Sequence, residues 1–419
     1  MKYLTSKHLK RDHLLVASAL YIFIIISMSI PRVYGANWRA IMEPAQMRNL
    51  QGFPVQWESY LVLRSTHAMS APVPTDDLVE WYSTDEYRAT LPIYFAATLA
   101  QFTNNYALAL HITDVFWWLL GALGVYAFVR EISNPMVALS AGLLSCYSPI
   151  GVSHMGSGTL HTASSLSISL YLCILYRVLT KYRSSLWGFV LLGVLFFLSS
   201  ITYTYQWFLI PFTLLLLIFC DYTLLPMFTL SLITFFSLRQ CSMYLLQIGG
   251  LIIHVHQNDP VRAIEYFFSS TVPAGAQFSS YITVIVRQFI VILDVIATSY
   301  HPVVILFAII GSIGVDNNAQ LRVTLSGTVV TLGVSFFYGM PWVVMSGYPI
   351  MYFLVSNGVY VICKRLNIGS RVGSIRISNY INFVVMFGFV NLLGIITNLD
   401  IIGNDSFAIS WWRGSYILH

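Results

Sequence analysis

Charged residues are scarce in this sequence. Asp, Glu, Lys and Arg make up only 9% of the 419 residues, whereas 57% are hydrophobic and 15% are aromatic. Soluble globular domains contain roughly 25% charged and roughly 45–50% apolar residues. This composition excludes a soluble globular protein, and it predicts an all-α polytopic membrane protein.

Cysteine is also scarce, and no soluble domain, fixed-period repeat or low-complexity tract is present. The cysteines are odd in number, lie in or beside apolar segments and show no CxxC spacing, which argues against a disulfide framework. They are Cys146, Cys173, Cys220, Cys241 and Cys363. We therefore predict one transmembrane domain, residues 1–419, with the cysteines as small core residues.

The basic residues predict a topology. The net charge is +5, but the basic side chains occur in short loops beside apolar runs, as the positive-inside bias requires, so they do not indicate nucleic-acid binding. Basic residues precede an apolar segment from Leu14 to Ile30, which has about the ~17–20 residues that one span needs. We expect this segment to be retained. The protein is then expected in the plasma membrane, with its N-terminus in the cytoplasm and the loop after this segment outside.

Later apolar runs give the number of spans. Two runs are ambiguous: 223–253 is one tilted helix or two helices broken near Arg239, and 282–298 is an in-plane helix or a span with a polar inner face. A basic cluster around Lys364 faces the cytoplasm only if the number of spans is odd. We predict eleven or thirteen, with 398–419 as an external tail. The runs are 107–129, 135–150, 160–177, 186–203, 205–220, 223–253, 282–298, 301–315, 323–338, 349–363 and 379–397.

Acidic residues gather in the predicted external loop 36–106. Five of them fall between Asp76 and Glu86, in the segment Asp-Asp-Leu-Val-Glu-Trp-Tyr-Ser-Thr-Asp-Glu. In a chain with so few charges, each carboxylate needs water or a partner. The alternatives are a solvated loop that separates two spans and a loop that carries chemistry.

The segment 115–220 resembles the membrane half of the GT-C glycosyltransferases, and of the oligosaccharyltransferase catalytic subunits in particular. The resemblance rests on Tyr-Ala-Phe-Val-Arg-Glu-Ile at 126–132, on Ser148-Pro149, on the turn His-Met-Gly-Ser-Gly at 154–158, and on Tyr-Thr-Tyr-Gln-Trp at 203–207. The segment Gly347-Tyr348-Pro349 resembles the region where those enzymes carry an arginine ahead of a proline, although no arginine stands in the positions just before Pro349 here. The resemblance implies a transferase that uses a polyprenyl-phosphate-linked sugar in the cell envelope.

This resemblance also implies site residues. The family places a catalytic carboxylate in the loop after the first span, which favours Asp85 as general base with Glu86 in support; the runner-up pair is Asp76 and Asp77. These last two carboxylates are also candidate ligands of a divalent cation, Mg²⁺ or Mn²⁺. The candidates for binding the donor phosphate are Arg88, His154, His161, Arg262 and Arg287.

Other polar residues in the spans allow different interpretations. His111 and Asp114 lie three residues apart on one helical face and are expected to pair with each other. Histidines near spans could instead ligate a pigment. The alternative function is therefore a non-catalytic GT-C-like or unrelated structural subunit that binds lipid or pigment beside other membrane subunits. A transporter is disfavoured because the sequence has no related halves.

Overall fold

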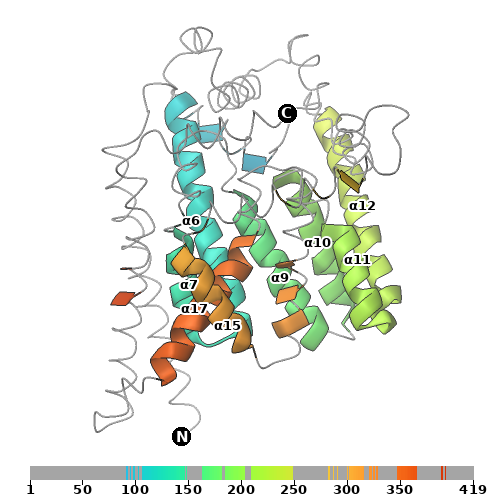
Figure 1. Cartoon of the computed structure of the whole chain (residues 1–419). Coiled ribbons are helices and arrows are strands. Elements are labelled where there is room, and N and C mark those ends of the chain that lie inside the picture. Colours follow the sequence, from blue (N-terminus) through green and yellow to red (C-terminus); the bar gives the residue numbers. More distant parts are fainter. Residues whose placement is uncertain are drawn as a thin grey trace, which may run out of the picture.

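All elements in the described part of this computed structural model are helices. The structure describes residues 106–146, 148, 163–181, 185–202, 209–248, 300, 302–315 and 347–365, with scattered residues in 91–102, 282–290, 320–328 and 388–392. The described helices, shown in Figure 1, are α6 (Tyr106–Ile132), α7 (Pro135–Cys146), α9 (Ser164–Thr180), α10 (Leu186–Thr202), α11 (Leu209–Cys220), the 3₁₀ turn η4 (Tyr222–Leu224), α12 (Leu225–Ile248), α15 (Pro302–Ile313) and α17 (Tyr348–Arg365).

The turn between α6 and α7 follows from two residues, Asn134 and Pro135. The Asn134 side chain accepts hydrogen bonds from the backbone N–H groups of Met136 and Val137, both at 3.0 Å, and so caps the start of α7. Pro135 occupies the first helical position, where its missing N–H costs nothing. The chain therefore reverses direction within two residues, and α7 packs antiparallel to α6 with Gly142 against the Ala122 carbonyl.

Glycine and serine allow the neighbouring helices to approach closely. Gly124 of α6 lies against Leu166 and Ser169 of α9, and Gly193 of α10 lies against the Ser231 carbonyl of α12. The hydroxyl of Ser231 in turn donates to the Phe189 carbonyl at 2.7 Å. Small residues at such contacts are typical of helices that pack within a membrane. Figure 1 shows α10, α11 and α12 together on one side of the bundle, with α9 between them and α6.

The tightest crossing joins α15 and α17. A Cβ atom added at Gly311 would lie 1.8 Å from the Leu354 carbonyl oxygen, and one added at Gly358 would lie 2.1 Å from the Phe307 carbonyl oxygen. The buried Asn357 amide also donates to the Gly311 carbonyl at 2.9 Å. The two backbones are therefore in direct contact at this crossing.

Large apolar side chains are exposed along the outer faces of several helices. Examples are Trp187 (79% exposed) on α10, Leu215 on α11 and Ile233 on α12, and on α15 the residues Leu306, Ile309 and Ile313 follow helical spacing. Small polar residues, mainly serine and threonine, are buried between the helices instead. Lipid would cover such outer faces favourably, because it leaves their apolar surface out of water.

Two helical stretches in the described residues are long and apolar enough to cross a membrane, Ile112–Ile132 and Tyr222–Cys241, and five apolar helices are shorter. The number of eleven to thirteen spans stays a prediction. Within the ambiguous run 223–253, α12 continues through Arg239 as one helix, so no break occurs at that residue. Of the ambiguous run 282–298, only four residues are described, and all four are helical.

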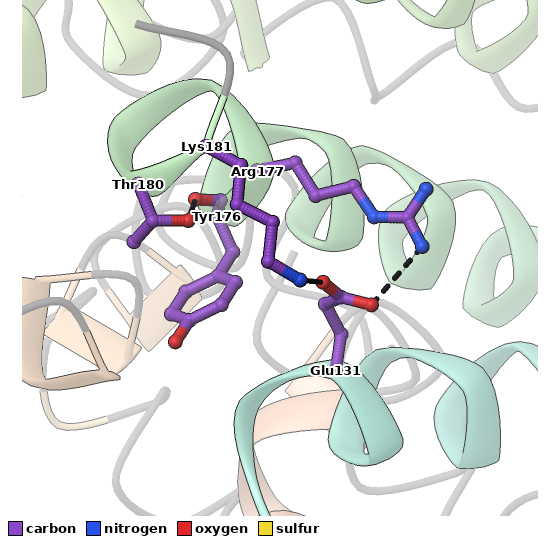
Figure 2. Close-up of polar contacts among 5 residues, drawn as sticks. All are labelled: Glu131, Tyr176, Arg177, Thr180 and Lys181. Atoms are coloured by element: carbon purple, nitrogen blue, oxygen red, sulfur yellow. Dashed lines mark hydrogen bonds and ion pairs between the residues drawn. The ribbon is translucent and has the colours of Figure 1, made fainter. Parts of the chain in front are cut away.

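A charged cluster joins the C-terminal ends of α6 and α9, as Figure 2 shows. The Glu131 carboxylate accepts a hydrogen bond from Arg177 at 3.0 Å and one from Lys181 at 2.5 Å. The hydrogen bond to Glu131, with the attraction of its charge, raises the pKa of Lys181. We call this the basic end of the bundle, because α17 runs parallel to α6 and α9, ends on the same side, and has Lys364 and Arg365 in its last turn. The opposite end, where α6 begins and the segment 36–106 joins it, is the loop end.

Replacing Glu131 tests whether this cluster holds α6 against α9. Glu131→Gln keeps the size of the side chain but removes the charge that pairs with two cations. Because Lys181 is 61% and Arg177 37% exposed, solvent screens both pairs, and we expect a loss of unfolding free energy of about 1 kcal/mol. Thermal unfolding in detergent measures it. Lys181→Gln is the control with a smaller expected effect, and an unchanged midpoint for Glu131→Gln would show that the cluster is not structural.

Candidate functional site

The candidate site lies on the side of the bundle toward the loop end. α6 begins at that end, whereas α7 ends and α9 begins beside the middle of α6, because Gly142 contacts Ala122 and Gly124 contacts Leu166. α17 begins beside the end of α7. The link 149–162, which contains His154 and His161, connects Ser148 after α7 to Ala163 before α9. Segments 36–106 and 149–162 are therefore attached on the loop-end side of the bundle, and Glu131, Lys181 and Lys364 lie at the opposite end.

A buried group of tyrosines joins α7 to α17 at this end. The Ser148 hydroxyl donates to the Tyr348 hydroxyl, across 200 positions of sequence. The Tyr348 and Tyr352 rings meet edge to face with centroids 5.3 Å apart, and Tyr300 contacts Tyr352 at 6.4 Å. All three tyrosines are at most 4% exposed. This group fixes the start of α17 beside the end of α7.

Tyr348 is the residue directly ahead of Pro349, in the segment that resembles the arginine-containing region of the GT-C glycosyltransferases. Pro349 lies in the first turn of α17, where a missing N–H is tolerated. Tyr348 is 2% exposed and its hydroxyl accepts from Ser148, so the residue packs in the core. Ser148 and Tyr348 both belong to the sequence motifs on which the resemblance rests. The sequence pattern missed Tyr352 and Tyr300, although the spacing of four between Tyr348 and Tyr352 places both on one helical face.

The chain just before α6 packs back onto that helix. The Phe95 ring stacks on Phe116 with centroids 4.6 Å apart, and it meets Trp117 edge to face at 6.4 Å. The described residues between Leu91 and Phe102 are helical. The C-terminal part of the predicted loop 36–106 is therefore held against the first half of α6, close to the loop end.

Two polar residues are fully buried in the same part of α6. Thr113 and Asp114 both have 0% exposure. A carboxylate inside a span is costly and usually faces a partner or a polar path. Asp114 does take part in interactions, but the side chain of His111 lies outside the described residues. The expected pair of His111 and Asp114 stays a prediction.

None of the predicted site residues falls within the described residues. These residues are Asp76, Asp77, Asp85, Glu86, Arg88, His154, His161, Arg262 and Arg287. Their positions along the chain are still informative: Arg88 lies three residues before the described Leu91, and both histidines lie in the link between α7 and α9. In the part of the chain that the structure describes, no three His, Cys, Asp or Glu side chains gather into a possible metal site.

Comparison with solved structures identifies the fold. The archaeal oligosaccharyltransferase AglB from Archaeoglobus fulgidus matches in its apo form with a TM-score of 0.55 and 11% identity, over 93% of this chain and 56% of that one. Its complex with an inhibitory peptide and a dolichol-phosphate matches with a TM-score of 0.54 and 11% identity, over 92% of this chain and 55% of that one. The form tethered to an acceptor peptide matches with a TM-score of 0.51 and 10% identity, over 94% and 55%.

The chain shares the fold of this archaeal oligosaccharyltransferase over the matched part. This confirms the resemblance seen in the sequence, at the level of the fold. The chain spans just over half the length of the archaeal enzyme. No protein-family model matches the sequence, and no curated protein matches it. The fold, the apolar composition and the exposed apolar helix faces together place the chain in a membrane.

Proposed function

We propose that this protein is a membrane glycosyltransferase that moves a sugar from a polyprenyl-phosphate donor to an acceptor on the external side of the membrane. One observation carries the proposal: 92% of the chain matches the fold of an oligosaccharyltransferase that has been solved with a dolichol-phosphate. The donor lipid, as well as surrounding membrane lipids, would be its partners.

The proposed reaction needs a base and a site for the leaving phosphate. An acceptor hydroxyl attacks the anomeric carbon of the sugar, and Asp85 takes the proton of that hydroxyl with Glu86 in support. The bond between the anomeric carbon and the phosphate oxygen breaks, and the polyprenyl phosphate leaves with the bonding electrons. Arginine binds phosphate with paired hydrogen bonds, so Arg88, Arg262 and Arg287 are the proposed phosphate ligands together with His154 and His161.

A divalent cation would share the charge of the leaving phosphate. Mg²⁺ and Mn²⁺ both prefer oxygen ligands, and the adjacent carboxylates of Asp76 and Asp77 have the right chemistry. We propose these two residues as cation ligands, separate from the general base. The cation would act as a Lewis acid toward the phosphate oxygens.

Purified protein reconstituted in lipid tests this function. A radiolabelled polyprenyl-phosphate hexose is supplied with peptide, glycan and lipid acceptors, and transfer is followed by loss of label from the donor. We expect transfer to at least one acceptor class, and release of polyprenyl phosphate. Absence of turnover with every donor, together with tight copurification in a larger complex, would favour the non-catalytic subunit instead.

The proposed topology gives a second expectation. We propose that the protein lies in the plasma membrane with its N-terminus in the cytoplasm and segment 36–106 outside. In that topology Lys181 and Lys364 lie on the cytoplasmic side. Single cysteines placed at 181, 364 and 85 in a cysteine-free chain are labelled with an impermeant maleimide from each side of the membrane. We expect position 85 to react from outside and the other two only from inside. External labelling at 364 would contradict the odd number of spans.

A further inference from the structure

Positive charge gathers at the basic end of the bundle. There the single carboxylate of Glu131 pairs with two cations, Arg177 and Lys181, and Lys181 is 61% exposed. The turn between α11 and α12, which lies at the same end in Figure 1, adds the carboxylate of Asp221. In the part of the chain that the structure describes, this end therefore has more cations than anions. The cations are Arg130, Arg177, Lys181, Arg322, Lys364 and Arg365.

Arg322 belongs to this end because of its helical neighbour Gln320. The Gln320 side-chain amide donates to the Ile132 carbonyl at the end of α6, so Arg322, two residues later, lies at a similar level. Arg322 is exposed, and so are Leu321 and Leu325 on the same short helix. A guanidinium group is costly to keep in hydrocarbon, but the long arginine side chain can carry its charge to the head groups while its stem stays among apolar side chains. Arg322 is therefore placed to contact a lipid phosphate.

Trp187 marks the level of the head groups at this end. It lies in the first turn of α10, which begins five residues after Lys181, and it is 79% exposed. Exposed tryptophan side chains are enriched where the hydrocarbon of a membrane meets the head groups. Leu191 and Leu198 are exposed on the same face of α10, which continues for about 16 Å beyond Trp187. One leaflet of a ~30 Å hydrocarbon core has about this depth, so the face is long enough for one acyl chain.

The excess of positive charge selects an anionic lipid. Lysine and arginine near the membrane surface attract anionic head groups, and basic surfaces at the ends of spans bind them. An acidic protein would match the charge but not the exposed leucines and Trp187 beside the cations. A polyprenyl phosphate is also anionic, but the proposed transfer uses it at the loop end, where segment 36–106 joins α6. The phospholipid of the adjacent leaflet matches both the charge and the apolar faces.

We propose that the basic end of the bundle binds anionic phospholipids of the surrounding leaflet. Their acyl chains lie along exposed apolar faces such as that of α10, and their phosphates contact the exposed cations. This surface goes beyond the proposed sugar transfer, and it does not depend on that function. The exposed cations are Lys181, Arg322, Lys364 and Arg365.

Lipid retention by the full chain tests this surface. The protein is reconstituted in nanodiscs of phosphatidylcholine and phosphatidylglycerol and extracted with mild detergent, and mass spectrometry measures the lipids that stay bound. We expect phosphatidylglycerol to be enriched over phosphatidylcholine by about fivefold or more, the factor that ~1 kcal/mol gives. High salt should lower the enrichment, because it screens exposed charges.

A triple variant removes the charge without touching the Glu131 cluster. Arg322→Gln, Lys364→Gln and Arg365→Gln together should abolish most of the enrichment. The matched triple variant Arg322→Lys, Lys364→Arg and Arg365→Lys keeps the charge, so it should retain phosphatidylglycerol as the wild type does. Arg239→Gln is a second control, because it removes a cation from the half of α12 nearer the loop end and should leave the enrichment unchanged. Thermal unfolding in phosphatidylcholine shows whether each variant is folded.

Three results would overturn the proposal. One is equal retention of the two phospholipids by the wild type. Another is full enrichment in the folded glutamine triple variant. The third is displacement of phosphatidylglycerol by equimolar sugar-free polyprenyl phosphate, which would make the basic end a site for the donor lipid. A protein that transfers no sugar, yet retains phosphatidylglycerol through these cations, would support the surface and reject the transferase.

Discussion

The substitution Asp85→Asn should lower sugar transfer by about 10²- to 10⁴-fold, the range that a general base contributes. Asparagine has nearly the size of aspartate but cannot take the proton of the attacking hydroxyl. Binding of the donor should change little, because the arginines and histidines proposed for the phosphate remain. Turnover of a polyprenyl-phosphate hexose under saturating acceptor, measured beside the donor dissociation constant, separates the two effects.

Asp76→Asn is the control for this substitution. It removes a carboxylate from the same segment, nine residues earlier, and it should lower transfer less than Asp85→Asn does. If Asp76 and Asp77 hold a cation, added Mg²⁺ or Mn²⁺ should restore part of the activity of Asp76→Asn and none of that of Asp85→Asn. Wild-type turnover by the Asp85 variant would remove this residue from the catalytic role.

The second large effect is expected at the crossing of α15 and α17. A Cβ at Gly311 would lie 1.8 Å from a backbone carbonyl, and one at Gly358 would lie 2.1 Å from another. Backbone atoms of two packed helices cannot move aside without separating the helices. We expect Gly311→Ala and Gly358→Ala each to lower the free energy of unfolding by about 3 kcal/mol, the upper part of the usual range for overpacking.

Gly388→Ala is the matched control for the crossing. An added Cβ there meets nothing within 4 Å, and alanine is favoured over glycine in a helix by about 1 kcal/mol. This variant should be neutral or slightly stabilising in thermal unfolding in detergent. Equal midpoints for Gly311→Ala and Gly388→Ala would mean that α15 and α17 do not meet at their glycines.

Helix positions could be predicted from the sequence because a helix that crosses a membrane needs a run of apolar residues about as long as the hydrocarbon core is thick. The run 186–203 corresponds to Leu186–Thr202, and the run 349–363 corresponds to Tyr348–Arg365. Whether 223–253 was one helix or two could not be decided in this way. Arg239 suggested a break, but a long side chain can carry its charge toward polar surroundings without one, and α12 continues through it.

Contacts between distant segments could not be predicted, because periodicity describes one helix at a time. Glu131 joins residues 46 and 50 positions later, and Ser148 joins Tyr348 across 200 positions. That the buried Trp117 indole has no hydrogen-bond partner among the described residues depends on its surroundings, which no motif records. The catalytic assignment, in turn, came from family resemblance at Asp85 and Glu86, which the described residues do not include.

Sugar transfer measured separately on each side of sealed proteoliposomes tests the central claim most directly. The protein is inserted in one orientation, cysteine labelling at position 364 determines which orientation that is, and a polyprenyl-phosphate hexose is included in the bilayer. Acceptor is then supplied in one compartment at a time. The account predicts transfer only when acceptor is on the side opposite position 364, where the segment 36–106 joins α6. Transfer on the side of position 364, or no transfer from either side, would contradict it.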